Sequence, residues 1–556
     1  MENRRIILIA LLGVVLFFMY QAWQQDYAQS ADTPPAETVA PLDDDAIPQA
    51  APADVPGAQL AAPAAAQPAA TGASVTVDTD VLRAEISLDG GELRRLLLKD
   101  YAVSKDQPDA PMALLDDRGT RLFIVQSGLA GADAPLVTHH TRFSAAQGSY
   151  RLAEGAETLD VVLEYQDPAG YSARKIYRFE RGRYRIELIH ELVNGSEREL
   201  VASPYARLVR TPFKAGDEPP FVATFTGVGF YEQKEGGGYR FQKTALDDLA
   251  EDAFETRQTG GWIAMLQHYF VAAILPPQDQ LATYTAKPAS GRGYMAQYVG
   301  ASQSVAPGQS ARFTTPLYVG PKLQDRVGDI APGFNLTLDY GILSPISEPL
   351  FWLLDKFHAL SGNWGVAIIL LTLLVKAAMY KLSEAQYRSM AKMKKFGPKI
   401  QDIRERYGDD RERMQKAMMD LYKKEGFNPL AGCWPLLVQF PVFIALYWVL
   451  LESVELRQAP FALWLQDLTS PDPYYVLPVL FGVSMFVQQK LSGQQVMDPM
   501  QQKIMNIMPI MLTAFFAFFQ SGLVLYWFVS NLIGIAQQWY ITRKLEREEA
   551  ARAAKR

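Results

Sequence analysis

The sequence predicts a polytopic α-helical membrane protein, with six transmembrane helices, that also carries a large all-β sandwich domain. Three observations predict this fold class. Five apolar segments after residue 340 are long enough to cross a hydrocarbon core of about 30 Å, and a sixth stands near the N-terminus. The region between alternates apolar and polar residues in short runs, as β-strands do. Finally, Lys376 lies inside an apolar segment, where a purely anchoring helix would carry no charge.

The composition excludes several classes of protein. The chain has 556 residues, a net charge of −6 and a mean hydropathy of −0.05, which averages a polar half and a hydrophobic half. This acidic balance argues against general nucleic-acid binding. The single cysteine, Cys433, excludes an intrachain disulfide framework and a multi-cysteine metal site. The chain has no glycine-rich phosphate-binding loop, which agrees with a function that uses no ATP. We also expect no cofactor and no bound metal.

The N-terminal segment, residues 1–22, is read as a transmembrane anchor. Asn3-Arg4-Arg5 precedes the apolar run Ile6 to Ala22, which is longer than most signal-peptide cores and favours a retained anchor. A signal peptide stays open as the alternative, because Ala28-Gln29-Ser30 is an acceptable cleavage site. Residues 23–74 are rich in Ala, Pro and Asp and have almost no large apolar side chains, which predicts a disordered linker.

Residues 75–340 are predicted to form the β domain. Alternating apolar positions recur around a turn at Gly90-Gly91 and again before Asn194-Gly195, and a stretch of this length suits one large β-sandwich. The two clearest runs are Leu82, Ala84, Ile86, Leu88 and Tyr184, Ile186, Leu188, His190, Leu192.

Residues 341–362 predict an amphipathic helix that lies in the membrane interface. The apolar side chains recur at helical spacing, with Asp355, Lys356 and His358 on the other side. A helix docked on the β domain is the alternative. The apolar face consists of Leu350, Phe351, Leu353, Leu354, Phe357 and Leu360.

The remaining segments predict a five-helix core whose loops set the topology. Loops rich in Lys and Arg stay in the cytoplasm, so both termini are expected there and the β domain in the periplasm. The expected spans are 363–383, 433–452, 474–491, 504–520 and 523–541. The expected loops are a cytoplasmic helical hairpin at 384–430, an acidic periplasmic loop at 453–473, a cytoplasmic loop at 492–503 and a basic cytoplasmic tail at 542–556.

Polar residues in four spans fall at similar depths in the cytoplasmic half of the membrane. At about 1.5 Å per residue, Lys376 lies just past the midplane, with Thr372 one turn before it on the same side. Two structural alternatives remain. The Lys376 side chain could snorkel to the lipid headgroups near Lys381, and the glutamines could form ordinary interhelical hydrogen bonds. The shared depth favours a wet, electropositive groove. The other residues at this depth are Gln439, Gln488 and the stretch from Asn531 to Gln537. In the last span one stripe of the helix is small or hydrogen-bonding, with Trp527, Ser530, Asn531, Gly534 and Gln538 recurring every three or four residues.

Several motifs closely resemble the Oxa-type insertase family, in the form found in Gram-negative bacteria, over nearly the whole chain. They are Asn428-Pro429-Leu430, Cys433, Pro435-Leu436-Leu437, Gln439, Pro441, Ser453-Val454-Glu455-Leu456-Arg457, Asp498-Pro499-Met500-Gln501-Gln502-Lys503 and Ser521-Gly522-Leu523-Val524-Leu525-Tyr526.

The resemblance implies a non-enzymatic insertase and chaperone of the inner membrane. It implies a hydrophilic groove open to cytoplasm and lipid, with one basic residue, here Lys376 where most relatives carry arginine. It also matches Trp527, beside Tyr526, to a substrate-facing aromatic position, and likens the β domain to a sugar-epimerase-type sandwich. The implied partners are nascent hydrophobic membrane proteins, membrane lipid and the Sec translocon, and the basic tail suggests ribosome contact.

Two rival functions are set against this interpretation. A secondary transporter would also use an intramembrane cation, although no inverted repeat is visible. A tethered periplasmic enzyme or sugar binder would need a site in the β domain. There, adjacent His139 and His140 would point to opposite faces of a strand and chelate poorly, and His190 and His268 fit satisfied core histidines better than catalysts.

Overall fold

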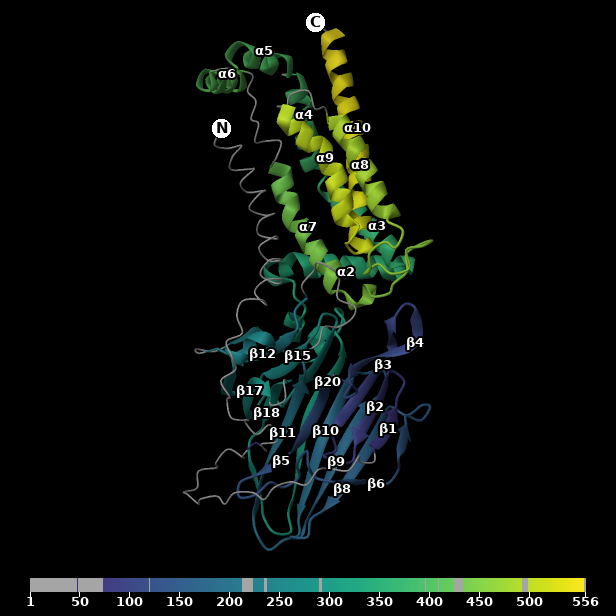
Figure 1. The fold of residues 1–556 in the computed structure, drawn as a ribbon, viewed down its shortest axis with the longest axis vertical. Helices are drawn as coiled ribbons and strands as arrows, with labels where there is room; N and C mark the ends of the chain where they lie inside the picture. Colours follow the sequence, from purple (N-terminus) through teal and green to yellow (C-terminus); the bar gives the residue numbers. More distant parts are fainter. Residues whose placement is uncertain are drawn as a thin grey trace. The chain divides into compact units, whose positions relative to one another are not determined.

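In a computed structural model, the residues described are 48, 74–119, 121–212, 224–234, 238–289, 293–395, 397–408, 410–424, 434–492 and 499–554. The predicted anchor 1–22, most of the linker, Cys433 and the start of the Asp498 motif lie outside them. The chain divides into a β domain that ends at Asp339 and a helical unit that begins at Tyr340 (Figure 1).

The β domain is a sandwich of two sheets, as the alternation predicts. One has the strand order β14-β17-β18-β11-β5-β3-β2-β1-β7, with β19 paired to β11 and β4 to β3; the other has the order β13-β12-β15-β16-β20-β10-β9-β8-β6. The two sheets pack against each other where β18 meets β15 and where β11 meets β16 and β20, among other contacts.

The strands of the first sheet are β1 (Ser74–Asp78), β2 (Leu82–Ser87), β3 (Leu93–Ser104), β4 (Gln107–Leu115), β5 (Phe123–Gly131), β7 (Ser149–Arg151), β11 (Leu200–Arg210), β14 (Phe254–Thr259), β17 (Leu281–Ala289), β18 (Gly293–Val299) and β19 (Gln303–Val305). Those of the second are β6 (Ser144–Ala145), β8 (Thr158–Gln166), β9 (Tyr171–Glu180), β10 (Arg185–Asn194), β12 (Gly227–Gln233), β13 (Tyr239–Ala245), β15 (Trp262–Leu266), β16 (Phe270–Ile274) and β20 (Ser310–Pro321).

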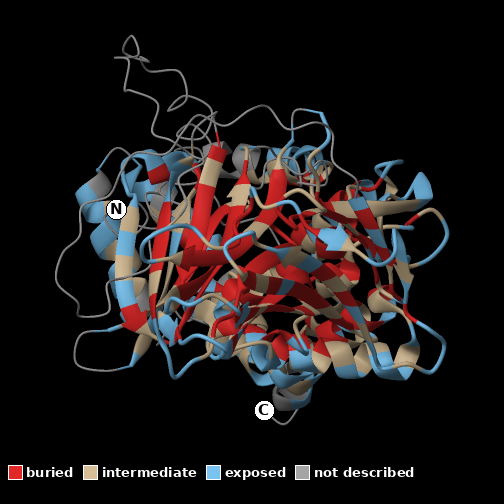
Figure 2. Cartoon of the chain, turned by 90° about the horizontal axis from the view of Figure 1, so that it is seen from below, coloured by how far each residue is buried: buried red, intermediate tan, exposed pale blue. Residues whose placement is uncertain are grey.

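The hydrophobic core lies between these sheets. Strand β2 buries Leu82, Ala84 and Ile86 on alternate positions, and Figure 2 shows buried residues along the strands with exposed residues mainly in the loops. The turn after β2 requires glycine at Gly90, which has φ of +76° and whose added Cβ would lie 2.1 Å from the carbonyl oxygen of His139. The turn therefore brings the His139 loop against the edge of the core.

The helical unit is built around α10, which packs against α3, α4, α7 and α8. This helix runs unbroken through the expected last span and most of the expected basic tail. The helices are α2 (Ser344–Ser361), α3 (Trp364–Ala378), α4 (Tyr380–Lys395), α5 (Gly397–Tyr407), α6 (Arg411–Lys424), α7 (Trp434–Glu452), α8 (Val476–Ser492), α9 (Pro499–Phe516) and α10 (Ser521–Ala554).

The expected span 363–383 is not one straight helix. Helix α3 ends at Ala378, the chain bends by 62°, and α4 begins at Tyr380. Over the described residues, no single helix is both long and apolar enough to pass a test for membrane crossing, although the bent pair α3 and α4 passes it together.

Helix α2 is amphipathic, but its buried face is narrower than the sequence predicts. Leu350, Phe351 and Leu354 are buried, and the helix packs against α3 and α7. Leu360, expected on the same face, is 79% exposed, and Trp352 is 59% exposed. Helices α5 and α6 contact each other in the segment expected to form a helical hairpin.

Candidate functional site

Lys376 lies in the last turn of α3 and is half-buried among apolar neighbours. Within the described part of the chain, its ammonium group has no carboxylate close enough to pair with. A lysine at the centre of a bilayer helix costs about 3 kcal/mol on insertion scales. In a bilayer such a cation is stabilised only by water, by lipid headgroups or by a polar group of a bound protein segment.

Thr372 stands one turn before Lys376, and its hydroxyl is bonded within its own helix. Its side chain is fully buried, and its hydroxyl donates a hydrogen bond of 2.6 Å to the carbonyl oxygen of Ile368 in the same helix. Because the hydroxyl proton is already used inside α3, Thr372 has no donor left for a substrate.

Helix α10 supplies polar contacts on both sides of the bend after Lys376. The side-chain amide of Gln537 donates to the carbonyl oxygen of Lys376 at 3.3 Å. The hydroxyl of Tyr387, on α4, donates to the carbonyl oxygen of Gly534 at 3.1 Å, and Tyr387 is also hydrogen-bonded to Gln488 of α8. Sequence reasoning placed Gln537 at a depth similar to Lys376 but did not foresee its contact with the Lys376 carbonyl, and it missed Tyr387 altogether, because tertiary packing creates both contacts.

A second polar contact joins α10 to α8. The amide of Asn531 donates to the hydroxyl of Ser484 at 2.8 Å, and that hydroxyl donates to the carbonyl oxygen of Phe481 at 2.7 Å. The structure thus connects Lys376, Gln488 and Asn531 through α10. Ser530 and Gln439 are half-buried.

Trp527 lies in a cluster of aromatic rings from three other helices. Its ring centroid is 3.7 Å from that of Phe516, 4.9 Å from that of Phe443 and 6.0 Å from that of Phe481. Among the residues that the structure describes, no hydrogen-bond acceptor faces its buried indole nitrogen. Tyr526 is only 2% exposed. The three phenylalanines were not among the predicted site residues, since aromatic residues are common in apolar spans.

At the other end of the bundle, the loop between α7 and α8 is tied to α3 and α10. Asn363 donates from its amide to the carbonyl oxygen of Phe461 at 2.9 Å, and Ser521 donates from its hydroxyl to the carbonyl oxygen of Asp467 at 2.7 Å. Gly365 makes this approach possible, because an added Cβ would lie 2.0 Å from the Phe461 ring. The loop therefore packs directly over the first turns of both helices.

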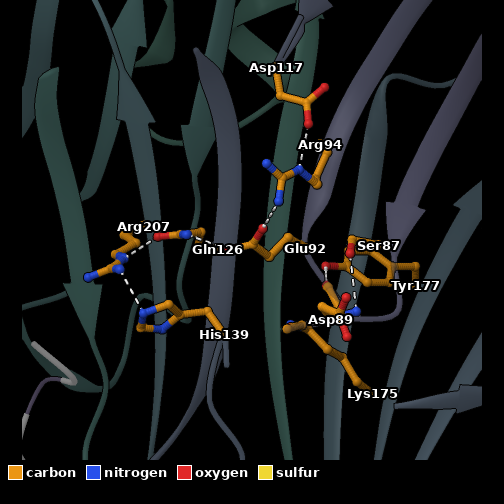
Figure 3. A network of polar contacts seen from close by, with 12 residues as sticks. Ser87, Asp89, Glu92, Arg94, Asp117, Gln126, His139, Lys175, Tyr177 and Arg207 are labelled. Atoms are coloured by element: carbon orange, nitrogen blue, oxygen red, sulfur yellow. Dashed lines mark hydrogen bonds and ion pairs between the residues drawn. The ribbon is translucent and has the colours of Figure 1, made fainter. Parts of the chain in front are cut away.

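The β domain contains a separate buried polar network, which bears on the rival enzymatic interpretation (Figure 3). Arg207 donates to the side-chain oxygen of Gln126 at 2.6 Å, Gln126 donates to Glu92, and Arg94 links Glu92 to Asp117 at 3.1 and 2.6 Å. Burial raises the pKa of Glu92, against the opposing effect of Arg94. Nearly every side chain of the network therefore forms a hydrogen bond or an ion pair with another side chain of the network.

His139 is part of this network and not of a strand, so the expected strand geometry at this position is wrong. It lies in a turn beside His140, with ring centroids 4.1 Å apart. Its two ring nitrogens contact the hydroxyl of Tyr205 at 2.7 Å and the guanidinium of Arg207 at 2.8 Å. Burial, with Arg207 second, lowers the pKa of His139 to about 2, so the ring is neutral at physiological pH.

His190 is a core residue, as expected, but not a satisfied one. It is buried on β10, and neither ring nitrogen has a hydrogen-bond partner in the described part of the β domain. Burial and the nearby Lys175 hold its pKa well below the ordinary value. His268 is also buried and stacks on Tyr269 at 3.8 Å. In the described part of the chain, no group of three or more His, Cys, Asp or Glu residues is arranged to hold a metal ion.

The described chain thus combines a β-sandwich with a bundle of apolar helices that contains a lysine. Two family models specify the class of protein. The model described as YidC periplasmic domain matches residues 74–353, and the model described as 60Kd inner membrane protein matches residues 356–549.

Full-length relatives agree with these matches. The membrane protein insertase YidC of Nitrosococcus oceani is 46% identical over 99% of this chain and 100% of its own length. That of Methylococcus capsulatus is 43% identical over 99% and 100%. A crystal structure of an active YidC insertase with its first transmembrane domain resolved covers 85% of this chain and 93% of its own, with 18% identity and a TM-score of 0.39. The chain belongs to the YidC family, whose members are named as inner-membrane insertases and not as enzymes.

Proposed function

We propose that this chain inserts hydrophobic proteins into the inner membrane through a hydrated, electropositive groove beside Lys376. One observation supports this most strongly: Lys376 sits in an apolar helix without a paired carboxylate in the described part of the chain, and Gln537 of α10 contacts its backbone carbonyl. An unpaired cation of this kind is a functional site by default in a membrane protein.

The physical problem is the polar flank of the entering segment. Each unpaired polar or charged group in hydrocarbon costs several kcal/mol, so a flank cannot cross a full bilayer unaided. A water-filled space in the cytoplasmic half shortens the apolar path. Lys376 attracts acidic residues of the flank, while the apolar faces of the helices receive the hydrophobic segment.

Release into lipid follows from the substrate itself. Burial of roughly 20 apolar residues in hydrocarbon stabilises the inserted helix. The membrane potential adds about 2.3 kcal/mol per 100 mV for each acidic charge moved outward. These two contributions drive insertion without nucleotide hydrolysis.

The proposed topology places both chain ends and the α5–α6 hairpin in the cytoplasm, with six spans in all. The C-terminal end of α10 exposes Arg543, Lys544 and Arg547. Their positive charge supports a cytoplasmic location for this end. Ribosome contact at this end, and cooperation with the Sec translocon, are proposed for the same protein. Glu546 and Glu548 interrupt the basic run, so ribosome contact rests on weaker grounds.

The test is insertion into reconstituted vesicles by wild type, Lys376→Arg and Lys376→Glu, with paired substrates that carry acidic or neutral flanks. We expect Lys376→Arg to retain insertion of both substrates. We expect Lys376→Glu to lower insertion of the acidic-flank substrate by about tenfold or more, because attraction becomes repulsion. Equal activity of all three proteins on that substrate would refute the electrostatic step. Labelled-solute uptake by the same vesicles would instead support the transporter.

A further inference from the structure

The bend between α3 and α4 has no cause in its own sequence. Sharp helix kinks occur at proline, at glycine or serine pairs, at π-bulges, or where a side chain enters the backbone ladder. From residue 366 to residue 395 the chain contains neither proline nor glycine, yet the axis turns by 62° at Met379. The cause must therefore be sought in contacts from other helices.

Contacts from α10 provide such a cause. At the break, the Met379 amide donates to the carbonyl oxygens of Val375 and Ala377. The Lys376 carbonyl instead receives the side-chain amide of Gln537, which is a side chain entering the ladder at the bend. This contact stabilises a backbone group that an unbroken helix would use internally.

Beyond the bend, α4 is fixed to the same helix. Tyr387 donates to the carbonyl oxygen of Gly534, one turn before Gln537. Gly534 leaves little room beside these side chains: an added Cβ would lie 3.2 Å from Nε2 of Gln488, which would have to shift by a few tenths of an ångström, and in ordinary contact at 3.5 Å from the Tyr387 hydroxyl. An ion pair of 3.8 Å between Lys544 and Glu384 adds a third connection between α10 and α4.

We propose that Gln537 and Tyr387 are positioning residues that hold the α3–α4 bend against α10 and so fix where Lys376 presents its charge. The functional effect of this bend rests on the proposed function, since the position of the charge matters only if Lys376 meets the substrate's flank. Neither residue needs to touch the substrate. The bend itself is a structural claim that does not depend on insertion.

The structural arm measures the bend directly. Spin labels at Leu373→Cys on α3 and Ala385→Cys on α4, both exposed positions, are introduced together with Cys433→Ser in the full chain in lipid bilayers. We expect one narrow distance distribution in the otherwise unaltered protein. In Gln537→Leu combined with Tyr387→Phe, the distribution should broaden or shift. An unchanged distribution would overturn the proposal.

The functional arm uses the acidic-flank and neutral-flank substrates without spin labels. The double variant should lose about fivefold in insertion of the acidic-flank substrate, as expected for loss of two modest hydrogen bonds. It should insert the neutral-flank substrate as wild type does. Gln386→Leu and Tyr540→Phe are matched controls away from the bend contacts and should behave as wild type.

The outcomes separate the two claims. Equal loss on both substrates would mean general destabilisation and would overturn the positioning role. A changed distance with unchanged insertion of both substrates would overturn it as well. Lys376→Glu tests the proposed function independently: if it inserts the acidic-flank substrate like wild type, the electrostatic step fails even where the spin-label distances support the bend.

Discussion

Lys175, on β9, donates two hydrogen bonds across the sandwich, to the carbonyl oxygens of Gly90 at 2.8 Å and Ser127 at 3.0 Å. Its side chain is fully buried and belongs to one sheet, whereas both acceptors belong to the other sheet or to its β2–β3 turn. A lysine amine therefore joins the two layers of the core, and this position makes the β domain sensitive to pH.

The first prediction concerns that amine. Burial lowers the pKa of Lys175 from 10.5 to about 7, against the opposing effect of Glu92. Between these values the unfolded chain binds the extra proton, so stability should rise with pH from about 7 upward, by at most about 1.4 kcal/mol per pH unit. Amide exchange of β9 in the full-length protein, corrected for the intrinsic rate, measures this. Lys175→Met should remove the slope, and exposed Lys105→Met should keep it.

The second prediction concerns Trp527 and its unpaired indole nitrogen. Trp527→Phe should be nearly neutral for stability, because it keeps an aromatic ring against Phe516 and removes a buried donor without an acceptor. Trp527→Ala should cost about 3 kcal/mol through lost packing. Unfolding in mild detergent compares the two variants. If Trp527→Phe lowered the free energy of unfolding clearly instead of leaving it nearly unchanged, the indole nitrogen would have a hydrogen-bond partner.

The third prediction tests the link between α8 and α10. Asn531→Leu and Ser484→Ala, singly and together, form a double-mutant cycle for the 2.8 Å hydrogen bond. We expect a coupling of about 0.6 kcal/mol, the average for such bonds in membrane bundles. Thermal unfolding of the four proteins gives the coupling. Additive effects within error would mean that the contact does not stabilise the bundle.

The fourth prediction concerns the loop over the first turn of α3. Gly365→Ala should destabilise that contact by about 1–3 kcal/mol, because the new methyl group overlaps the Phe461 ring. Protease cleavage of the loop between α7 and α8 should accelerate. Phe461→Leu in the same chain should restore part of the protection. Gly362→Ala should also destabilise the segment, because Gly362 has φ of +65°, but Phe461→Leu should not rescue it, since its added Cβ would meet no atom within 4 Å.

Much of the architecture follows from local patterns, and the exceptions have a common physical origin. Alternation in β2 places Leu82, Ala84 and Ile86 in the core because one face of each strand is buried. Lys376 stands out because its neighbours along the chain are apolar. The bend at Met379 was not predictable in the same way, since no proline or glycine marks it and α10 supplies the contacts that accompany it.

The candidate site shows the same division between local and tertiary information. Helical spacing places Thr372 beside Lys376 but does not reveal that its hydroxyl is already bonded to Ile368. The role of His139 depends on Tyr205 and Arg207, which are more than 60 residues away in sequence. Such long-range partners leave no periodic signal in the chain.

The unbroken course of α10 has a mechanical consequence. Its 34 residues extend about 51 Å, which exceeds a hydrocarbon layer of about 30 Å. A force or twist applied near its basic end is therefore carried along a stiff rod to Gln537, Gly534 and Trp527. A partner bound to the far end of this helix would therefore move all three residues as one body.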